Sequence, residues 1–204
     1  MRRPMSLGLT LAIAACLSAD APTKNETLLR DDFKSADHQD RAASRGDWKV
    51  SGGVISVTQD PVLYEKYANH GPLLAYEIPH DDAEARVQFK PQGCKTVVFT
   101  MDAETGHAFR IILRTDRLGS IYGYDPQPGA DRPKANPLSR EMPMLKDNEW
   151  TSLSARVTGQ TATVIVNGKE FKVTHPSIDQ NKTTVKIGFA FGSFAVRSFE
   201  LDAI

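Results

Sequence analysis

Three short strands joined by tight turns are predicted between residues 150 and 174. Apolar and polar residues alternate over Trp150–Val157, Gln160–Val166 and Lys169–Thr174. This period of two is typical of an antiparallel strand with one buried and one solvated face. Asn167-Gly168 separates the last two segments, and Asn-Gly between alternating segments strongly favours a two-residue hairpin turn. A chain of such pieces must bury its apolar faces against a second sheet.

The same alternation recurs along most of the chain, and no window shows a sustained helical period of 3.6 residues. We therefore predict an all-β domain over residues 28–204, an antiparallel two-sheet β-sandwich of the jelly-roll type. Residues 126–147 are the exception, because they contain five prolines and no clear period. A loop of this length is either functional or a solvated excursion over one sheet edge. The further predicted strands are Trp48–Val50, Val54–Val57, Leu73–Ile78, Ala83–Lys90, Thr96–Met101, His107–Arg114, Ser120–Tyr124, Val185–Phe191 and Phe194–Leu201.

The N-terminus has the pattern of an export signal. Two arginines precede a short apolar run, Leu7–Leu17, so residues 1–20 are predicted to be a signal peptide. Ile13-Ala14-Ala15-Cys16 matches a bacterial lipobox, which predicts lipidation of Cys16; the alternative is an ordinary signal peptide cut near Ala19. Residues 21–27 would then be a short tether. We expect an exported protein of the periplasm or cell envelope, in contact with a membrane only through this lipid anchor.

Charge and cysteine content narrow the range of functions. Lys plus Arg and Asp plus Glu number 25 each, and a chain without a basic surplus is not expected to bind nucleic acid. The second cysteine, Cys94, has no partner once Cys16 is lipidated or removed, so the core must be held by packing. We expect Cys94 to be a passive turn residue.

Several segments together resemble a known superfamily. They are Asp31-Asp32-Phe33, Trp48–Val57, Glu149-Trp150, Arg156–Gly159, Val164–Lys169 and Val185–Phe189. In these the chain resembles the laminin-G-like, concanavalin-A-like jelly rolls, and more narrowly it is similar to bacterial exported domains of the 3-keto-disaccharide hydrolase type. The resemblance implies the fold and a function connected with carbohydrate. The paired-glutamate motif of laminarinase-like relatives, Glu-x-Asp-x-x-Glu, is absent, so no catalytic set transfers residue by residue.

A sugar site is predicted from the faces of the central strands. If Ala83–Lys90, Thr96–Met101 and His107–Arg114 form a three-strand meander, matching their apolar faces pairs Val87 with Phe99 and Phe99 with Phe109. The opposite face then forms one polar surface. Guanidinium groups donate hydrogen bonds in a fixed fork and tyrosine rings offer a flat surface to a sugar, whereas a plain solvated face is the alternative. The predicted ligand-binding residues are Arg86, Gln88, Arg110, Tyr122 and Tyr124.

Three residues are candidates for catalysis. Glu84 and Asp102 would lie side by side at the end of this meander, and glycoside hydrolysis usually needs two carboxylic acids. His107 begins a strand; strict alternation turns it into the core, but at a strand end it could instead border the cleft. No cofactor and no zinc cluster is predicted, although Asp31, Asp32 and Asp202 could together bind calcium.

Three functions remain open from the sequence. The first is an exported domain that binds a carbohydrate on the concave face of one sheet. The second is a glycoside hydrolase of the 3-keto-disaccharide hydrolase type. The third is a structural or protein-interaction domain without a sugar site.

Overall fold

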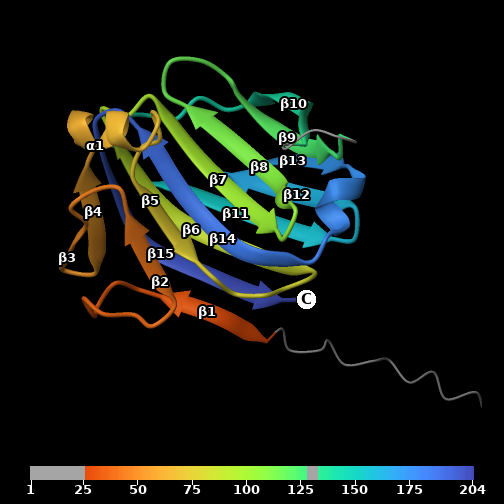
Figure 1. Ribbon diagram of the computed structural model, residues 1–204, viewed down its shortest axis with the longest axis horizontal. Coiled ribbons are helices and arrows are strands. Elements are labelled where there is room, and N and C mark those ends of the chain that lie inside the picture. The colour runs from red at the N-terminus through yellow and green to blue at the C-terminus, as the bar shows by residue number, and fades with distance from the viewer. Residues whose placement is uncertain (1–25, 128–132) are drawn as a thin grey trace, which may run out of the picture.

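The computed structural model describes residues 26–127 and 133–204. Two antiparallel sheets stack face to face, as Figure 1 shows, so the predicted all-β sandwich of the jelly-roll type is confirmed. The predicted signal peptide and the lipidation site Cys16 lie outside the described residues. Within the described ranges, no helix is both long and apolar enough to cross a bilayer.

The first layer, here called sheet A, has eight strands. Seven of them form one hydrogen-bonded series, and β1 (Thr27–Asp31) pairs with β15 beside it. The tight hairpin predicted at Asn167-Gly168 is present between β12 and β13, and both residues have positive φ. In spatial order the series is β13 (Lys169–Thr174), β12 (Thr161–Val166), β11 (Thr151–Thr158), β6 (Ala83–Gln92), β15 (Ser193–Ala203), β4 (Val54–Thr58) and β3 (Lys49–Ser51).

The second layer, sheet B, has seven strands and lies in front in Figure 1. The order is not sequential, because β14, near the C-terminus, inserts between β7 and β5. In spatial order the strands are β10 (Lys134–Met142), β9 (Gly119–Asp125), β8 (Gly106–Arg114), β7 (Thr96–Ala103), β14 (Lys182–Ala190), β5 (Leu73–Tyr76) and β2 (Arg41–Ser44).

One core fills the space between the sheets. Phe89 of sheet A and Phe99 and Phe109 of sheet B belong to the same buried cluster. Strand β6 shows the pattern most clearly, because buried and half-buried residues alternate over its whole length. The hydrophobic alternation therefore correctly predicts which side chains point inward.

The predicted three-strand meander is wrong. β6 belongs to sheet A, while β7 and β8 belong to sheet B, so the chain crosses the sandwich after Gln92. Phe99 lies opposite Ile111 and Ile187, and not opposite Val87 or Phe109. Apolar alternation cannot distinguish the two arrangements, because a strand stacked across the core buries the same side chains as a strand paired within the sheet.

The predicted long loop also contains a strand. β10 pairs with β9 at the edge of sheet B and carries Pro137. Proline removes a backbone donor and is tolerated in edge strands, so its presence hid this strand from the sequence pattern. Two short helices were likewise not predicted: α1 (Pro61–Lys66), capped by Asp60, and the 3-10 helix η1 (Pro176–Asp179).

Candidate functional site

His107 projects from the outer face of sheet B because of an irregularity in β8. The β7–β8 register shifts between Met101, which lies opposite Phe109, and Asp102, which lies opposite His107. Ala108 is the extra residue, and it is buried together with Phe109. Such a bulge reverses the alternation for the residues beyond it. His107 therefore points outward, and not into the core as strict alternation predicts.

The register then places complementary side chains in rows across the sheet. Lys186 of β14 lies opposite Thr100 of β7, and Thr100 lies opposite Arg110 of β8. Arg110 in turn lies opposite Tyr122 of β9. Asp102, in the next row, faces His107. Side chains at directly opposite positions are close enough to interact, so this part of sheet B gathers two cations, a carboxylate and a histidine.

The hydrogen bonds define the state of His107. Its Nδ1 lies 2.6 Å from Oδ1 of Asp102, and Nη2 of Arg110 contacts its Nε2. A guanidinium group can only donate, so Nε2 must accept and the proton of a neutral ring must lie on Nδ1. Nδ1 then donates to the carboxylate. Asp102 thus orients the imidazole and leaves Nε2 as its basic atom.

Asp102 is held ionised by its surroundings. Burial alone would raise the pKa of this carboxyl group, but hydrogen bonds from His107 and Lys186 outweigh burial and hold the pKa below its ordinary value. The Lys186 ammonium contacts Oδ2, so both carboxylate oxygens have partners. The carboxylate is therefore an acceptor that fixes its neighbours and is not a proton donor at neutral pH.

One aromatic ring, that of Tyr124, completes one side of this group. The ring of Tyr124 lies 5.1 Å from the imidazole of His107 in an edge-on arrangement, and 5.9 Å from the guanidinium carbon of Arg110. Burial raises the pKa of Tyr124, so its phenol stays neutral. Nε of Arg110 also donates to the hydroxyl of Thr100 at 3.3 Å. The guanidinium is thus oriented by neutral groups on two sides.

A hollow of about 320 Å³ opens over these rows. Thr100, Arg110, His107 and Lys186 line it from β7, β8 and β14. The opposite wall comes from the loops before β3 and β5 and from the first residue of β5, and it includes Arg45 and His70–Leu73. A concave site with a few converging polar groups is the usual form of a small-molecule pocket.

The 3-10 helix η1 supports the site from behind. The Ser177 hydroxyl donates to the carbonyl of Ala108 at 2.7 Å and accepts from the backbone N–H of Tyr124 at 3.0 Å. His175 caps η1 and lies 3.1 Å from the Asp125 carboxylate. Because Ser177 binds the bulge residue and the backbone of Tyr124, it holds the two neighbouring rings in place.

The other predicted site residues lie on the opposite side of the molecule. Glu84, Arg86 and Gln88 project from β6 onto the outer face of sheet A. They cannot meet Asp102 or Arg110, because the two sheets, about 10 Å apart, lie between them. The predicted Glu84–Asp102 pair and the shared Arg86–Arg110 surface are therefore wrong. Of the predicted residues, the structure brings together Asp102, His107, Arg110, Tyr122 and Tyr124.

Arg86 is neutralised where it lies. Its guanidinium group bonds Glu200 at 3.0 Å, contacts Asp202 and lies 3.6 Å from Glu84. Glu84 also accepts a hydrogen bond from Ser154 at 2.7 Å. The charge of Arg86 is thus cancelled within this face, in agreement with the alternative of a plain solvated face for this part of the prediction.

The three aspartates suggested for calcium are kept apart. Asp31 is buried and bonds Tyr76 at 2.8 Å and Arg41 at 3.1 Å, while Asp32 pairs with Lys34 at the surface. Asp202 contacts Arg86. No group of His, Cys, Asp and Glu within residues 26–127 and 133–204 is arranged to hold a metal ion. Cys94 is buried, and burial raises its pKa to about 12, so its thiol stays protonated.

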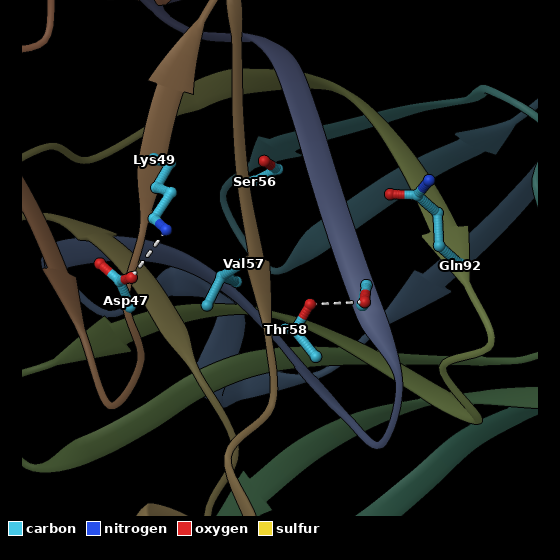
Figure 2. A pocket seen from close by; sticks show the side chains of 7 residues that line it. Asp47, Lys49, Ser56, Val57, Thr58 and Gln92 are labelled. Atoms are coloured by element: carbon cyan, nitrogen blue, oxygen red, sulfur yellow. Dashed lines mark hydrogen bonds and ion pairs between the residues drawn. The ribbon is translucent and has the colours of Figure 1, made fainter.

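Another hollow, shown in Figure 2, lies at the end of sheet A. Lys49 and Asp47 pair there at 3.1 Å but are 73% and 83% exposed. The hydroxyls of Thr58 and Ser193 bond one another at 2.8 Å. Its polar groups are therefore either solvated or satisfied among themselves, and the hollow over β7, β8 and β14 is the better candidate site.

Sequence reasoning missed two basic residues of that site. Lys186 lies on the polar side of an alternating strand, so its outward direction could be predicted from the sequence. The residues next to it on neighbouring strands could not. Arg45 belongs to no motif, and it reaches the site through a loop. The position of both residues in the site depends on the strand order of sheet B, in which β14 and β5 follow β7.

Solved structures of carbohydrate-active proteins share this fold. A CBM2 module of the evolved Dit protein of Lactobacillus casei BL23 phage J-1 matches with a TM-score of 0.63 at 11% identity, over 88% of this chain and 96% of the module. A β-1,3-1,4-glucanase (lichenase) from a mouse hindgut metagenome gives 0.63 at 12% identity, over 86% and 99%. The CBM66 module of Bacillus subtilis gives 0.59 at 7% identity, over 80% and 96%. No curated protein matches the sequence.

The sequence itself matches one family model over most of its length. The match covers residues 27–196, from β1 into β15, both in sheet A. It includes every residue of the candidate site described above. The chain therefore belongs to the family of 3-keto-alpha-glucoside-1,2-lyase-like domains.

Proposed function

We propose that the protein binds a carbohydrate in the hollow over β7, β8 and β14. The observation that carries this proposal is the geometry of Arg110. Its guanidinium is oriented by Thr100, His107 and Tyr124, and within the described residues it forms no ion pair with a carboxylate. A preoriented donor without an acidic partner is suited to the hydroxyl and carbonyl oxygens of a sugar.

The surroundings support a sugar ligand in two further ways. The Thr100 hydroxyl and the Lys186 ammonium line the hollow beside Arg110, and the Tyr124 ring borders a second hollow of about 490 Å³ that shares His107. The family is named for a glycoside, and the fold is shared with carbohydrate-binding modules.

A glycan-binding screen of the purified full-length chain tests this function. We expect Arg110→Ala to lose binding of any retained oligosaccharide, whereas Arg117→Ala, a charge change on the exposed turn after β8, should keep it. Failure of every sugar to bind, or equal binding by both variants, would overturn the proposal.

A second candidate function is lyase chemistry, and the Asp102–His107 pair favours it. In a 3-keto-glucoside the C2 proton is acidified by the adjacent ketone, so a base can remove it. The electron pair left on C2 then forms the C1–C2 double bond, and the C1–oxygen bond breaks as the second sugar leaves with the electrons and a proton. Nε2 of His107, oriented by Asp102, would accept the C2 proton once the substrate displaces Arg110, and Arg110 would then stabilise the enolate oxygen.

Turnover separates this chemistry from binding alone. With a 3-keto-glucoside as substrate, wild-type protein should release the second sugar and an unsaturated keto sugar, detected by mass spectrometry. His107→Gln removes the base but keeps a planar polar side chain, so we expect it to bind and not to turn over. Binding without turnover by the wild type would exclude the lyase and leave the binding function.

We also propose that the chain is exported and anchored to a membrane through lipid on Cys16. The lipobox-like sequence Ile13–Cys16 after an apolar run supports this proposal. Metabolic labelling with an alkyne fatty acid should mark the wild type and not Cys16→Ser; equal labelling of both would contradict it.

A further inference from the structure

The basic side chains around the candidate site exceed what a neutral sugar needs. Arg45, Arg110 and Lys186 line the hollow over β7, β8 and β14, and no Asp or Glu lines it. The nearest carboxylate, Asp102, contacts Lys186 and His107. Three basic side chains against one carboxylate leave a local surplus of two positive charges.

This surplus does not follow from the composition of the chain, whose net charge is zero. Around Arg86 on the other sheet the charges are instead balanced, because Glu84, Glu200 and Asp202 surround it. Two of the three cations of the hollow, Arg45 and Arg110, form no ion pair among the residues that the structure describes. A concave surface with charges of one sign raises the local concentration of ligands with the opposite sign.

Arg45 lies on the wall opposite the Asp102–His107 pair. It comes from the loop after β2, at the far edge of sheet B, whereas Arg110 and His107 come from β8. Its guanidinium carbon lies 5.8 Å from the ring centroid of Tyr67, which leaves the fork of donors oriented by an aromatic face. The chain beside Arg45 packs closely, because a Cβ on Gly46 would approach the Val57 side chain to 2.6 Å. The second guanidinium thus comes from a segment that packs against β4.

We infer that the site recognises a sugar bearing a carboxylate, such as a uronic acid residue, with Arg45 and the row of Lys186 and Arg110 supplying the charge complement. A guanidinium group binds a carboxylate through two parallel hydrogen bonds, which are stronger than bonds to neutral hydroxyls. The inference rests on the proposed sugar-binding function of the same hollow and adds the chemical class of the ligand.

Paired ligands test the charge requirement. Disaccharides ending in glucose, galactose or mannose are compared by calorimetry with the corresponding uronic acids and with their uncharged carboxamides, on the full-length chain. We expect an acid to bind about tenfold more tightly than its carboxamide and its neutral parent. The advantage should shrink at high ionic strength, because salt screens exposed charges.

Variants locate the effect. Arg45→Gln replaces the guanidinium group with an uncharged polar side chain and should remove most of the preference for the acid. Because position 45 has a φ of 62° and neither residue is glycine, the backbone cost is similar in both proteins. Arg117→Gln is the matched control and should retain the preference.

The outcomes separate the two proposals. Equal affinity for acid, carboxamide and neutral sugar overturns the inference and leaves sugar binding standing. Binding of none of them overturns both. A preference for the acid that survives Arg45→Gln overturns the role given to Arg45.

Discussion

The two outer faces of the sandwich carry similar residues in opposite arrangements. On sheet A, Arg86 is enclosed by Glu84, Glu200 and Asp202, so its charge is cancelled within the protein. On sheet B, Arg110 is oriented by Thr100, His107 and Tyr124 and forms no ion pair among the described residues. A guanidinium group in an alternating strand is therefore no indication of a site by itself; the partners on neighbouring strands decide whether it is available to a ligand.

The largest difference between the faces is expected when each arginine is removed. Arg110→Met should weaken sugar binding between about tenfold and a hundredfold, because a charged hydrogen bond to the ligand is lost. Arg86→Met should leave the affinity unchanged, but lower the melting temperature, since three carboxylates would then lie together without their cation. Calorimetric titration and thermal unfolding of both variants make the measurement. A loss of affinity in Arg86→Met would break the distinction between the faces.

The support behind sheet B gives the next effect. Ser177→Ala removes the donor to the Ala108 carbonyl and the acceptor for the Tyr124 N–H, and both groups are buried. Leaving a buried polar group unpaired costs about 1–3 kcal/mol of unfolding free energy. We also expect weaker sugar binding, because the bulge that directs His107 outward is loosened. Urea unfolding and calorimetry measure the two effects.

The matched control is Ser152→Ala on the exposed outer face of sheet A. It should change neither stability nor affinity. Rescue of the affinity by Ser177→Thr, which retains a hydroxyl, would separate the hydrogen bond from side-chain packing. If Ser177→Ala lost stability but kept full affinity, a role in positioning His107 would be excluded.

Acid unfolding compares the carboxylates of the two faces. The pKa of Asp102 and that of Asp202 both lie below the ordinary value of 3.8: burial opposes this in each case, but bonds from His107 and Lys186, and from Arg86, outweigh it. A carboxyl with a lowered folded pKa stabilises the protein above its unfolded pKa, and this stability is lost as the pH falls through the folded value. The free energy of unfolding should therefore decrease as the pH drops below about 4.

Asparagine at position 102 or 202 should make the free energy of unfolding depend less on pH below about pH 4. We expect Asp102→Asn to lower stability at pH 7 by about 1–3 kcal/mol and also to weaken binding, because Lys186 and His107 lose their common partner. Asp202→Asn should reduce the pH dependence of stability in the same way without changing the affinity for the ligand. If the pH dependence of stability were unchanged in both variants, Asp102 and Asp202 would not be ionised groups that stabilise the fold.

The smallest effects are expected for the remaining polar residues of sheet A. Gln88→Ala removes a contact with Arg197 at 2.6 Å on an exposed surface, and such changes usually alter stability by less than about 0.5 kcal/mol. Glu84→Gln should leave sugar affinity and any turnover intact. Loss of turnover in Glu84→Gln would indicate instead that catalysis takes place on the outer face of sheet A.

Five of the eight predicted site residues lie together because they come from three consecutive strands of sheet B. Asp102, His107 and Arg110 lie in β7 and β8, which are joined by a short turn, and consecutive strands usually pair. Tyr122 and Tyr124 follow in β9 for the same reason. The direction of His107 was not predictable, because a bulge depends on the backbone register and leaves no period in the sequence.

The other three predicted residues lie elsewhere because the chain crosses from one sheet to the other between β6 and β7. Glu84, Arg86 and Gln88 are correctly predicted to point outward, but they point out of the other sheet. Lys186 was missed for the converse reason, because β14 is distant in sequence from β7 and adjacent to it in space. Local alternation predicts which face of its own sheet a side chain lies on. The neighbours of a strand depend instead on the path of the whole chain.

The sequence by itself determined that this protein is a two-layer β-structure and which side chains enter its core, because burial of apolar surface acts on every strand with a period of two. Only the tertiary structure decided which arginine is neutralised and which faces a hollow. Charge pairing acts over a few ångströms between strands, and the long connections of a jelly roll bring those strands together without any local sequence signal.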